Sequence, residues 1–338
     1  MAEENEVMSQ VTYEELASIE SEFEDIDNEI MKKQYEMSKA AYAKRAAAIS
    51  KIPNFWPLVI EASPPEIDGF VHPQDSKIFA DSLTNISVTR HELDATPQGH
   101  PRSVTITLDF KENDFFTDSS LSKKFWYRRA QDGWVGLVSE PVKINWKKGQ
   151  DPTEGLVDGA HALFEARKKT GDMASKGLPE YTALKKKTEH SNGQNTSFFS
   201  WFGFVSSRRW VSAEEAKKAD AEHTSRLEAR KRGEKVEIPE EEDDEEDEDN
   251  GDQAVEVFDN GDDLATTLAE EIWPNAIKYF TQAQEMGDEE LSELDFEDME
   301  EDDDGDDEPV DIRALVADKG GKSKRQSDAG PPAKKQKK

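Results

Sequence analysis

The 338-residue chain contains no cysteine, so disulfides, cysteine-based zinc clusters and thiol catalysis are all excluded. It also lacks any apolar run long enough to span a bilayer, and its acidic N-terminus lacks the basic-then-apolar order of a signal peptide. These absences predict a soluble, intracellular protein that makes no contact with membranes.

Catalytic and cofactor-binding motifs are missing as well. The six histidines are scattered, and the chain has no HExxH pair, no phosphate-binding loop, no dinucleotide-binding glycine pattern and no nucleophile elbow. Carboxylates are so frequent that no single pair of them indicates a general acid and base. We therefore expect no enzymatic activity, no cofactor and no metal site.

Basic residues are scarce toward the end of the chain. Residues 1–238 hold 39 acids and 33 bases, whereas residues 239–338 hold 36 acids and 10 bases, so their net charges are −6 and −26. The second part is mostly a polyanion that cannot bury enough apolar surface to fold as one piece. Its charge repels nucleic acid, so little direct nucleic-acid binding is expected, and it attracts basic partners.

The segment 11–52 contains neither glycine nor proline, and it predicts one long helix. Its first half is acidic and its second half basic. A helix of this length cannot fold back on itself, so its apolar seam requires a second helix. Because the charge is polarised, the best partner is a second copy running antiparallel. The expected dimer seam consists of Leu16, Ile19, Phe23, Ile26, Ile30 and Met37; beside it a second seam contains Met31, Tyr35, Tyr42 and Ile49.

An antiparallel sheet of four or five strands should follow the long helix. The clearest strand is 103–110, in which apolar and polar residues alternate, so that one face is core and the other is solvated. The expected strands are 84–92, 103–110, 123–129, 134–138 and 142–146. Helices near 74–83, 156–169 and 264–280, the last broken by Pro274, are expected to cover one face of this sheet.

These elements predict an α+β protein with four parts. Residues 1–10 form a disordered N-terminus and residues 11–52 the long dimerisation helix. Residues 53–285 form the helix-covered sheet, with a basic loop at 167–196 and a disordered charged insertion at about 206–258, in which residues 213–232 have helical character and residues 240–249 are all acidic. Residues 286–338 form a disordered acidic tail that ends in a basic cluster.

Five short sequences occur in an order that resembles one known family. They are IPNFW (52–56), LSKKF (121–125), INWKKG (144–149), SFFSWF (197–202) and EIWPN (271–275). Over roughly residues 10–285 the chain is similar to the nucleosome assembly protein family, specifically its SET (template-activating factor) branch. The resemblance implies an antiparallel dimer through the long helix and an α/β "earmuff" domain whose underside binds core histones, assisted by the acidic tail.

Residue by residue, the resemblance implies a histone-binding surface made by Ser200, Asp262, Asp263, Glu270 and Glu271. The chain departs from the branch in two places: Gly203, Phe204 and Val205 stand where polar and acidic residues are usual, and about fifty residues are inserted before EIWPN. Aromatic residues of these motifs, such as Trp201 and Trp273, are interpreted as core.

The basic cluster at the end of the chain suits a nuclear import signal; it comprises Lys324, Arg325, Lys334, Lys335, Lys337 and Lys338. We therefore expect a histone chaperone that is nuclear, shuttles with the cytoplasm, binds core histones and promotes nucleosome assembly. The alternative is an acidic nuclear regulator that docks on an enzyme, either as a phosphatase inhibitor or as a histone acetyltransferase cofactor.

Overall fold

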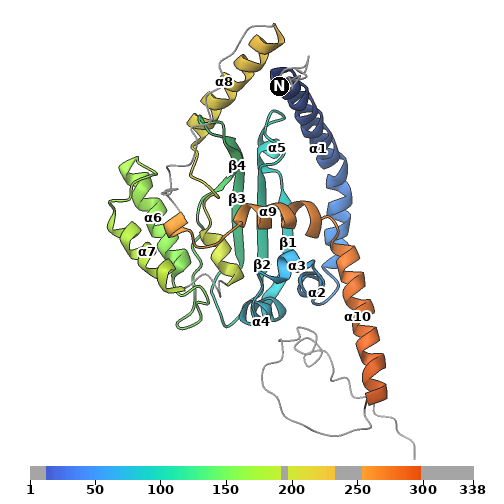
Figure 1. Cartoon of the computed structure of the whole chain (residues 1–338). Coiled ribbons are helices and arrows are strands. Elements are labelled where there is room, and N and C mark those ends of the chain that lie inside the picture. The colour runs from blue at the N-terminus through green and yellow to red at the C-terminus, as the bar shows by residue number, and fades with distance from the viewer. Residues whose placement is uncertain (1–12, 192–196, 233–252, 298–338) are drawn as a thin grey trace, which may run out of the picture.

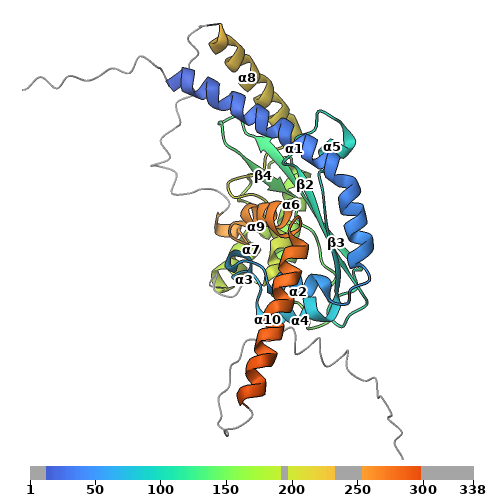
Figure 2. The ribbon, with the colours of Figure 1, turned by 90° about the vertical axis from the view of Figure 1, so that its right-hand side faces the viewer.

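The long helix α1 spans Tyr13–Ile49, as the sequence predicts. The computed structural model describes residues 13–191, 197–232 and 253–297. At ~1.5 Å per residue the 37 residues of α1 extend over roughly 54 Å, along one side of the folded domain (Figures 1 and 2). The expected disordered segment 1–10 and the terminal basic cluster lie outside the described residues.

Helix α1 has two different faces. One face is half-buried against the rest of the chain and presents Ser21, Asn28, Tyr35, Tyr42 and Ile49, which are seven residues apart. The other face is the predicted dimer seam, and nothing within the described residues covers it. Its six side chains are between 51% and 74% exposed: Leu16, Ile19, Phe23, Ile26, Ile30 and Met37.

The sheet contains four antiparallel strands in the order β1-β2-β3-β4, which confirms the α+β class. Buried and half-exposed residues alternate in β2, so one face of the sheet is core. The strands are β1 (Leu83–Thr89), β2 (Val104–Phe110), β3 (Ser120–Arg129) and β4 (Val135–Ser139). Two expectations were wrong. The strand expected to reach residue 92 ends at Thr89 and is followed by a short helix, α5 (His91–Ala95), and residues 142–146 contribute only one isolated bridge, between Trp146 and Phe116.

Short helices cover the core face of the sheet (Figure 1). They are α2 (Phe55–Glu61), α3 (Pro65–Asp68), α4 (Pro73–Ser82), the 3₁₀ helix η1 (Phe198–Gly203), α9 (Gly261–Thr267) and the π-helical turn η3 (Leu268–Ile272). The longer helix α10 (Ala276–Glu297) packs on α2 and extends beyond the end of the sheet (Figure 1). The SFFSWF motif forms η1, and its aromatic side chains are fully buried, as expected for core residues.

Two buried charged groups fix η1 in place. The Lys123 ammonium on β3 donates to the carbonyl oxygens of Glu140, Phe202 and Phe204 at 3.2, 3.1 and 2.8 Å, and its burial lowers its pKa well below the usual value. At the other end of η1, the Asp75 carboxylate accepts hydrogen bonds from the Ser197 hydroxyl and the Phe198 amide, while burial raises its pKa. The position of η1 is therefore set by directional bonds as well as by packing.

The region expected to be a basic loop contains a second helix. Helix α6 (Leu156–Thr170) ends at Gly171, whose φ of 76° suits the left-handed C-terminal position, and α7 (Pro179–Ser191) packs back on it. A small apolar cluster between them includes Leu163, Leu184 and Val257 and extends to η2 (Gln253–Val255).

The charged insertion is also partly folded. Helix α8 (Ala213–Lys231) confirms the helical character predicted for residues 213–232 within the insertion, and Val211 and Ala216 at its base pack on Val138 of β4. Helix α10 continues to Glu297, twelve residues into the segment assigned to the acidic tail. Residues 233–252 and the tail from 298 onward lie outside the described residues.

Candidate functional site

One stretch of the folded domain, between residues 253 and 277, carries charge of one sign only. This stretch contains six acidic residues and no lysine, arginine or histidine. We refer to these six residues as the acidic ridge: Glu256, Asp259, Asp262, Asp263, Glu270 and Glu271. Asp259, Asp263 and Glu270 are exposed, and the other three are partly exposed.

The local fold explains why the ridge faces outward. Leu264, Leu268 and Ile272 recur every four residues along α9 and η3 and are buried in the core, which turns the acids between them toward solvent. Asp262 and Asp263 also occupy the first turn of α9, where a negative charge is favourable beside unpaired backbone N–H groups. The sequence thus places acids on the surface without cost to the helix.

Ser200 is not part of this surface. Its side chain is fully buried in η1, so we exclude it from the contact set that the family resemblance implied. The motif instead supports the ridge from beneath, because the Trp201 Nε1 donates to the carbonyl oxygen of Gly261 at 2.8 Å, one residue before Asp262. The four predicted acids, by contrast, are all brought together on α9 and η3.

Two of these acids also have partners within the chain. A Glu270 carboxylate oxygen lies 3.6 Å from the Arg90 guanidinium, and Glu271 accepts a 2.6 Å hydrogen bond from the Tyr279 hydroxyl. Their charge is therefore partly balanced or fixed in position. Asp259 and Asp263 are the more exposed carboxylates, and they are the better sites at which to test the contribution of the ridge.

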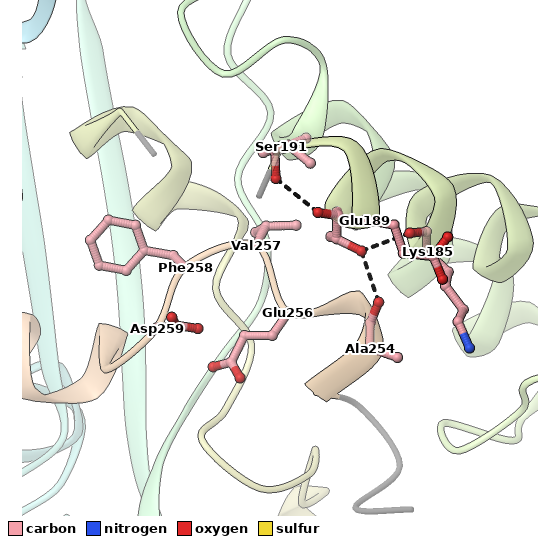
Figure 3. A pocket seen from close by; sticks show the side chains of 10 residues that line it. Lys185, Glu189, Ser191, Ala254, Glu256, Val257, Phe258 and Asp259 are labelled. Carbon is pink, nitrogen blue, oxygen red and sulfur yellow. Dashed lines mark hydrogen bonds between the residues drawn. The ribbon is translucent and has the colours of Figure 1, made fainter. Parts of the chain in front are cut away.

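A cleft adjoins the ridge between α7 and residues 254–259 (Figure 3). Glu189 of α7 lies on one side, and Glu256 and Asp259 lie on the other. The Thr188 hydroxyl holds the two sides together by donating to the carbonyl oxygen of Ala254 at 2.9 Å. Sequence reasoning missed Glu256 because it assigned that residue to the insertion; the absence of any base from 253 to 277 was the available signal.

This geometry suits charge-based binding rather than bond-making chemistry. Among the described residues, no group of three or more His, Asp or Glu side chains could hold a metal ion. No helix in the described ranges is long and apolar enough to cross a membrane. A fixed row of carboxylates on a rigid helix pair provides a negative surface for a protein rich in lysine and arginine.

A long helix followed by a helix-covered antiparallel sheet with an acidic ridge defines a protein-binding module for basic partners. Residues 2–283 match the family model described as "Nucleosome assembly protein (NAP)". The chain belongs to the nucleosome assembly protein family, and this membership identifies it as a histone chaperone with a role in nucleosome assembly.

Several relatives are similar over most of their length. A Schizosaccharomyces pombe protein named for nucleosome assembly is 29% identical over 301 residues, covering 86% of each chain. NAP1-related protein 2 of Arabidopsis thaliana is 26% identical over 80% of this chain and 76% of its own. Among solved structures, Vps75 is 24% identical and covers 80% of this chain and 97% of its own, and a Ccp1 mutant is 26% identical over 83% and 97%; both have a TM-score of 0.48.

Proposed function

We propose that this protein is a homodimeric nuclear histone chaperone of the SET branch that holds core histones against the acidic ridge, assisted by the acidic tail. The observation that carries the proposal is the run of six acids without a base, four of them on α9 and η3 and two in the loop before α9, above a buried aromatic core. Core histones are strongly basic, so a negative surface of fixed geometry attracts and orients them. The five motifs IPNFW, LSKKF, INWKKG, SFFSWF and EIWPN support the branch assignment.

The dimer follows from the exposed seam of α1. Six large apolar side chains lie in one row on a helix, each more than half exposed, and isolated rows of this kind are costly in water. A second copy running antiparallel would cover the seam and place the acidic N-terminal half of each helix beside the basic C-terminal half of the other.

Chaperone action on this surface is a competition between two polyanions. While bound, a histone is shielded from nonproductive contact with DNA. Duplex DNA carries one negative charge per roughly 1.7 Å of helix axis, a denser array than the ridge, so DNA accepts the histone once it can form nucleosome contacts. The protein therefore needs only to hold histones tightly enough to prevent aggregation. The import signal at residues 324–338 accounts for the proposed nuclear location, with shuttling to the cytoplasm.

A histone titration with matched charge reversals tests this proposal. Asp259→Lys with Asp263→Lys changes two exposed ridge positions, and Glu112→Lys with Asp114→Lys makes the same net charge change at exposed positions after β2. We expect the ridge pair to weaken binding of purified core histones by tenfold or more and the control pair to have a small effect. Equal effects of the two pairs would mean that histone binding depends on the net charge of the protein and not on the position of the ridge. A regulator that docks only on an enzyme would not bind free histones at all.

A further inference from the structure

The inserted helix α8 is anchored on the face of the sheet opposite the core. The Ser212 hydroxyl caps the helix by accepting from the Glu215 amide at 3.1 Å, and the Glu215 carboxylate is paired with Arg209 at 2.6 Å. Val211 and Ala216 pack on Val138 of β4 in an apolar cluster bordered by Trp126 and Trp210. The base of α8 is thus fixed to the folded domain.

Beyond this base, α8 runs beside the N-terminal half of α1. The two helices are in contact, and in both views they extend beyond the same end of the sheet and lie close together at their far ends (Figures 1 and 2). Buried and half-buried residues recur every three or four positions along α8 at Ala216, Ala219, His223, Arg226 and Arg230, and Glu215, Leu227 and Ala229 beside them are half-buried too. This spacing is that of a helix with one packed face.

Charge accompanies the packing. Asp220 of α8 lies 3.5 Å from the Arg129 guanidinium at the end of β3. Next to it, His223 is half-buried, and the charges of Arg129 and Arg226 act on it together with those of Glu24 on α1 and Asp220. The last turns of α8 carry Arg226, Arg230 and Arg232, and the acidic part of α1 lies alongside. The arginines in the last turns of α8 therefore complement the acidic half of α1 in charge.

Helix α8 and the dimer seam lie on opposite sides of α1. Ser21 and Asn28 are half-buried on the inner face, whereas Ile19, Phe23 and Ile26 are exposed. At about 100° per residue, the two sets are roughly 170° apart around the helix axis. Helix α8 therefore leaves the seam clear and supports α1 from behind.

We propose that α8 is a brace that holds the N-terminal half of α1 in position, so that the seam is ordered before a second copy binds. The C-terminal half of α1 has its own anchors, because Tyr35 and Lys39 both bond to Asp94 of the folded domain. Ordering a helix during association weakens binding, whereas a preformed helix avoids that cost. This inference rests on the proposed dimer, and it means that α8 contributes to the affinity of the dimer without contacting the second copy.

A charge reversal at Asp220 tests the brace in the full chain. Asp220→Arg places a third cation beside Arg129 and Arg226, and Arg129→Asp in the same chain restores an opposite pair. Glu228→Arg makes the same charge change at an exposed position of α8. The readouts are the dimer dissociation constant by sedimentation and the hydrogen-exchange rate of residues 16–30, with exchange in β1–β3 as the check on folding.

We expect Asp220→Arg to weaken the dimer roughly three- to tenfold and to speed exchange in residues 16–30, with recovery in the double variant and no change in Glu228→Arg. If Asp220→Arg changed neither the dimer dissociation constant nor the hydrogen-exchange rate of residues 16–30, the proposed role of α8 would be wrong and the proposed dimer would be unaffected. A wild-type chain that sediments as a monomer would instead overturn the dimer, and with it this role of α8.

Discussion

The Arg45 guanidinium on α1 lies 4.5 Å from the centroid of the Trp273 indole and donates to the carbonyl oxygens of Trp273 and Pro274. Trp273 belongs to the EIWPN motif and in turn donates from Nε1 to the carbonyl oxygen of Ile86 on β1 at 3.0 Å. Arg45 and Trp273 thus connect three parts of the chain: the long helix, the segment that follows the acidic ridge and the edge of the sheet.

Replacing Arg45 with alanine should loosen this junction. The change removes two hydrogen bonds from a charged donor and the stacking on Trp273, so we expect a loss of about 2 kcal/mol in the free energy of unfolding. Lys44→Ala, at the neighbouring exposed position, is the control. Urea denaturation followed by circular dichroism measures both, and equal midpoints for the two variants would show that the junction contributes nothing.

Local periodicity made much of this fold predictable. The long helix was predicted because its seam residues from Leu16 to Ile30 are alternately three and four apart, and β2 was predicted because its alternation is strict. Both signals are carried by neighbouring residues. Four of the six ridge acids, Asp262, Asp263, Glu270 and Glu271, were predicted through their position at or just before the EIWPN motif.

Contacts between distant residues explain the errors. Residues 142–146 alternate like a strand, but the Val142 amide bonds to the carbonyl oxygen of Phe202 in η1, so the segment follows that turn instead of the sheet. Helix α7 buries only Tyr181 and Leu184, too few to give an amphipathic signal. Helix α8 is highly charged, and only its packing on Val138 shows why it folds.

The second prediction concerns the dimer. Ile19→Asp with Ile26→Asp would place four charges in the paired seam, and each buried charge without a partner costs several kcal/mol. We expect this variant to sediment as a folded monomer at micromolar concentration while the wild type is a dimer. Ala43→Asp with Ala47→Asp, at exposed positions away from the seam, should remain dimeric. Monomers in both double variants would point to charge in general instead of the seam.

The third prediction concerns pH. Burial, and then the charges of Arg102 and Lys32, lower the pKa of His100 to about 4. The ring stacks on Tyr127 with centroids 4.1 Å apart, and its Nδ1 accepts from the Arg102 amide at 3.2 Å. In the unfolded chain a histidine has a pKa near ~6.5, so the unfolded state binds more protons between pH 4 and 6.5. The stability from neutral His100 is complete above pH 6.5 and is lost as pH falls through this window.

Between pH 7.5 and pH 5 this linkage should remove about 2 kcal/mol from the free energy of unfolding. His100→Asn keeps a hydrogen-bond acceptor near the position of Nδ1 and does not titrate, so its pH dependence should be shallower by that amount. The test is to measure the denaturation midpoints of the wild type and of His100→Asn across this pH range. Parallel curves would mean that His100 is accessible to protons in the folded state.

The last prediction separates the ridge from the tail by their response to salt. Deleting residues 298–308 removes nine acids and no base, and it leaves both α10 and the terminal basic cluster in place. Interactions between exposed charges are screened beyond about 8 Å at physiological ionic strength, so attraction between charges that are not in direct contact fades as salt rises. Four ridge carboxylates are fixed on α9 and η3, Asp259 lies two residues before α9, and these groups would lie in direct contact with a histone. We therefore expect the deletion to weaken histone binding mainly at low salt, and Asp259→Lys with Asp263→Lys to weaken it at every salt concentration. The measurement is a core-histone titration of each variant across a salt series. If the deletion abolished binding throughout while the ridge reversals left it unchanged, histones would be held by the tail, and the folded domain would serve only to dimerise it.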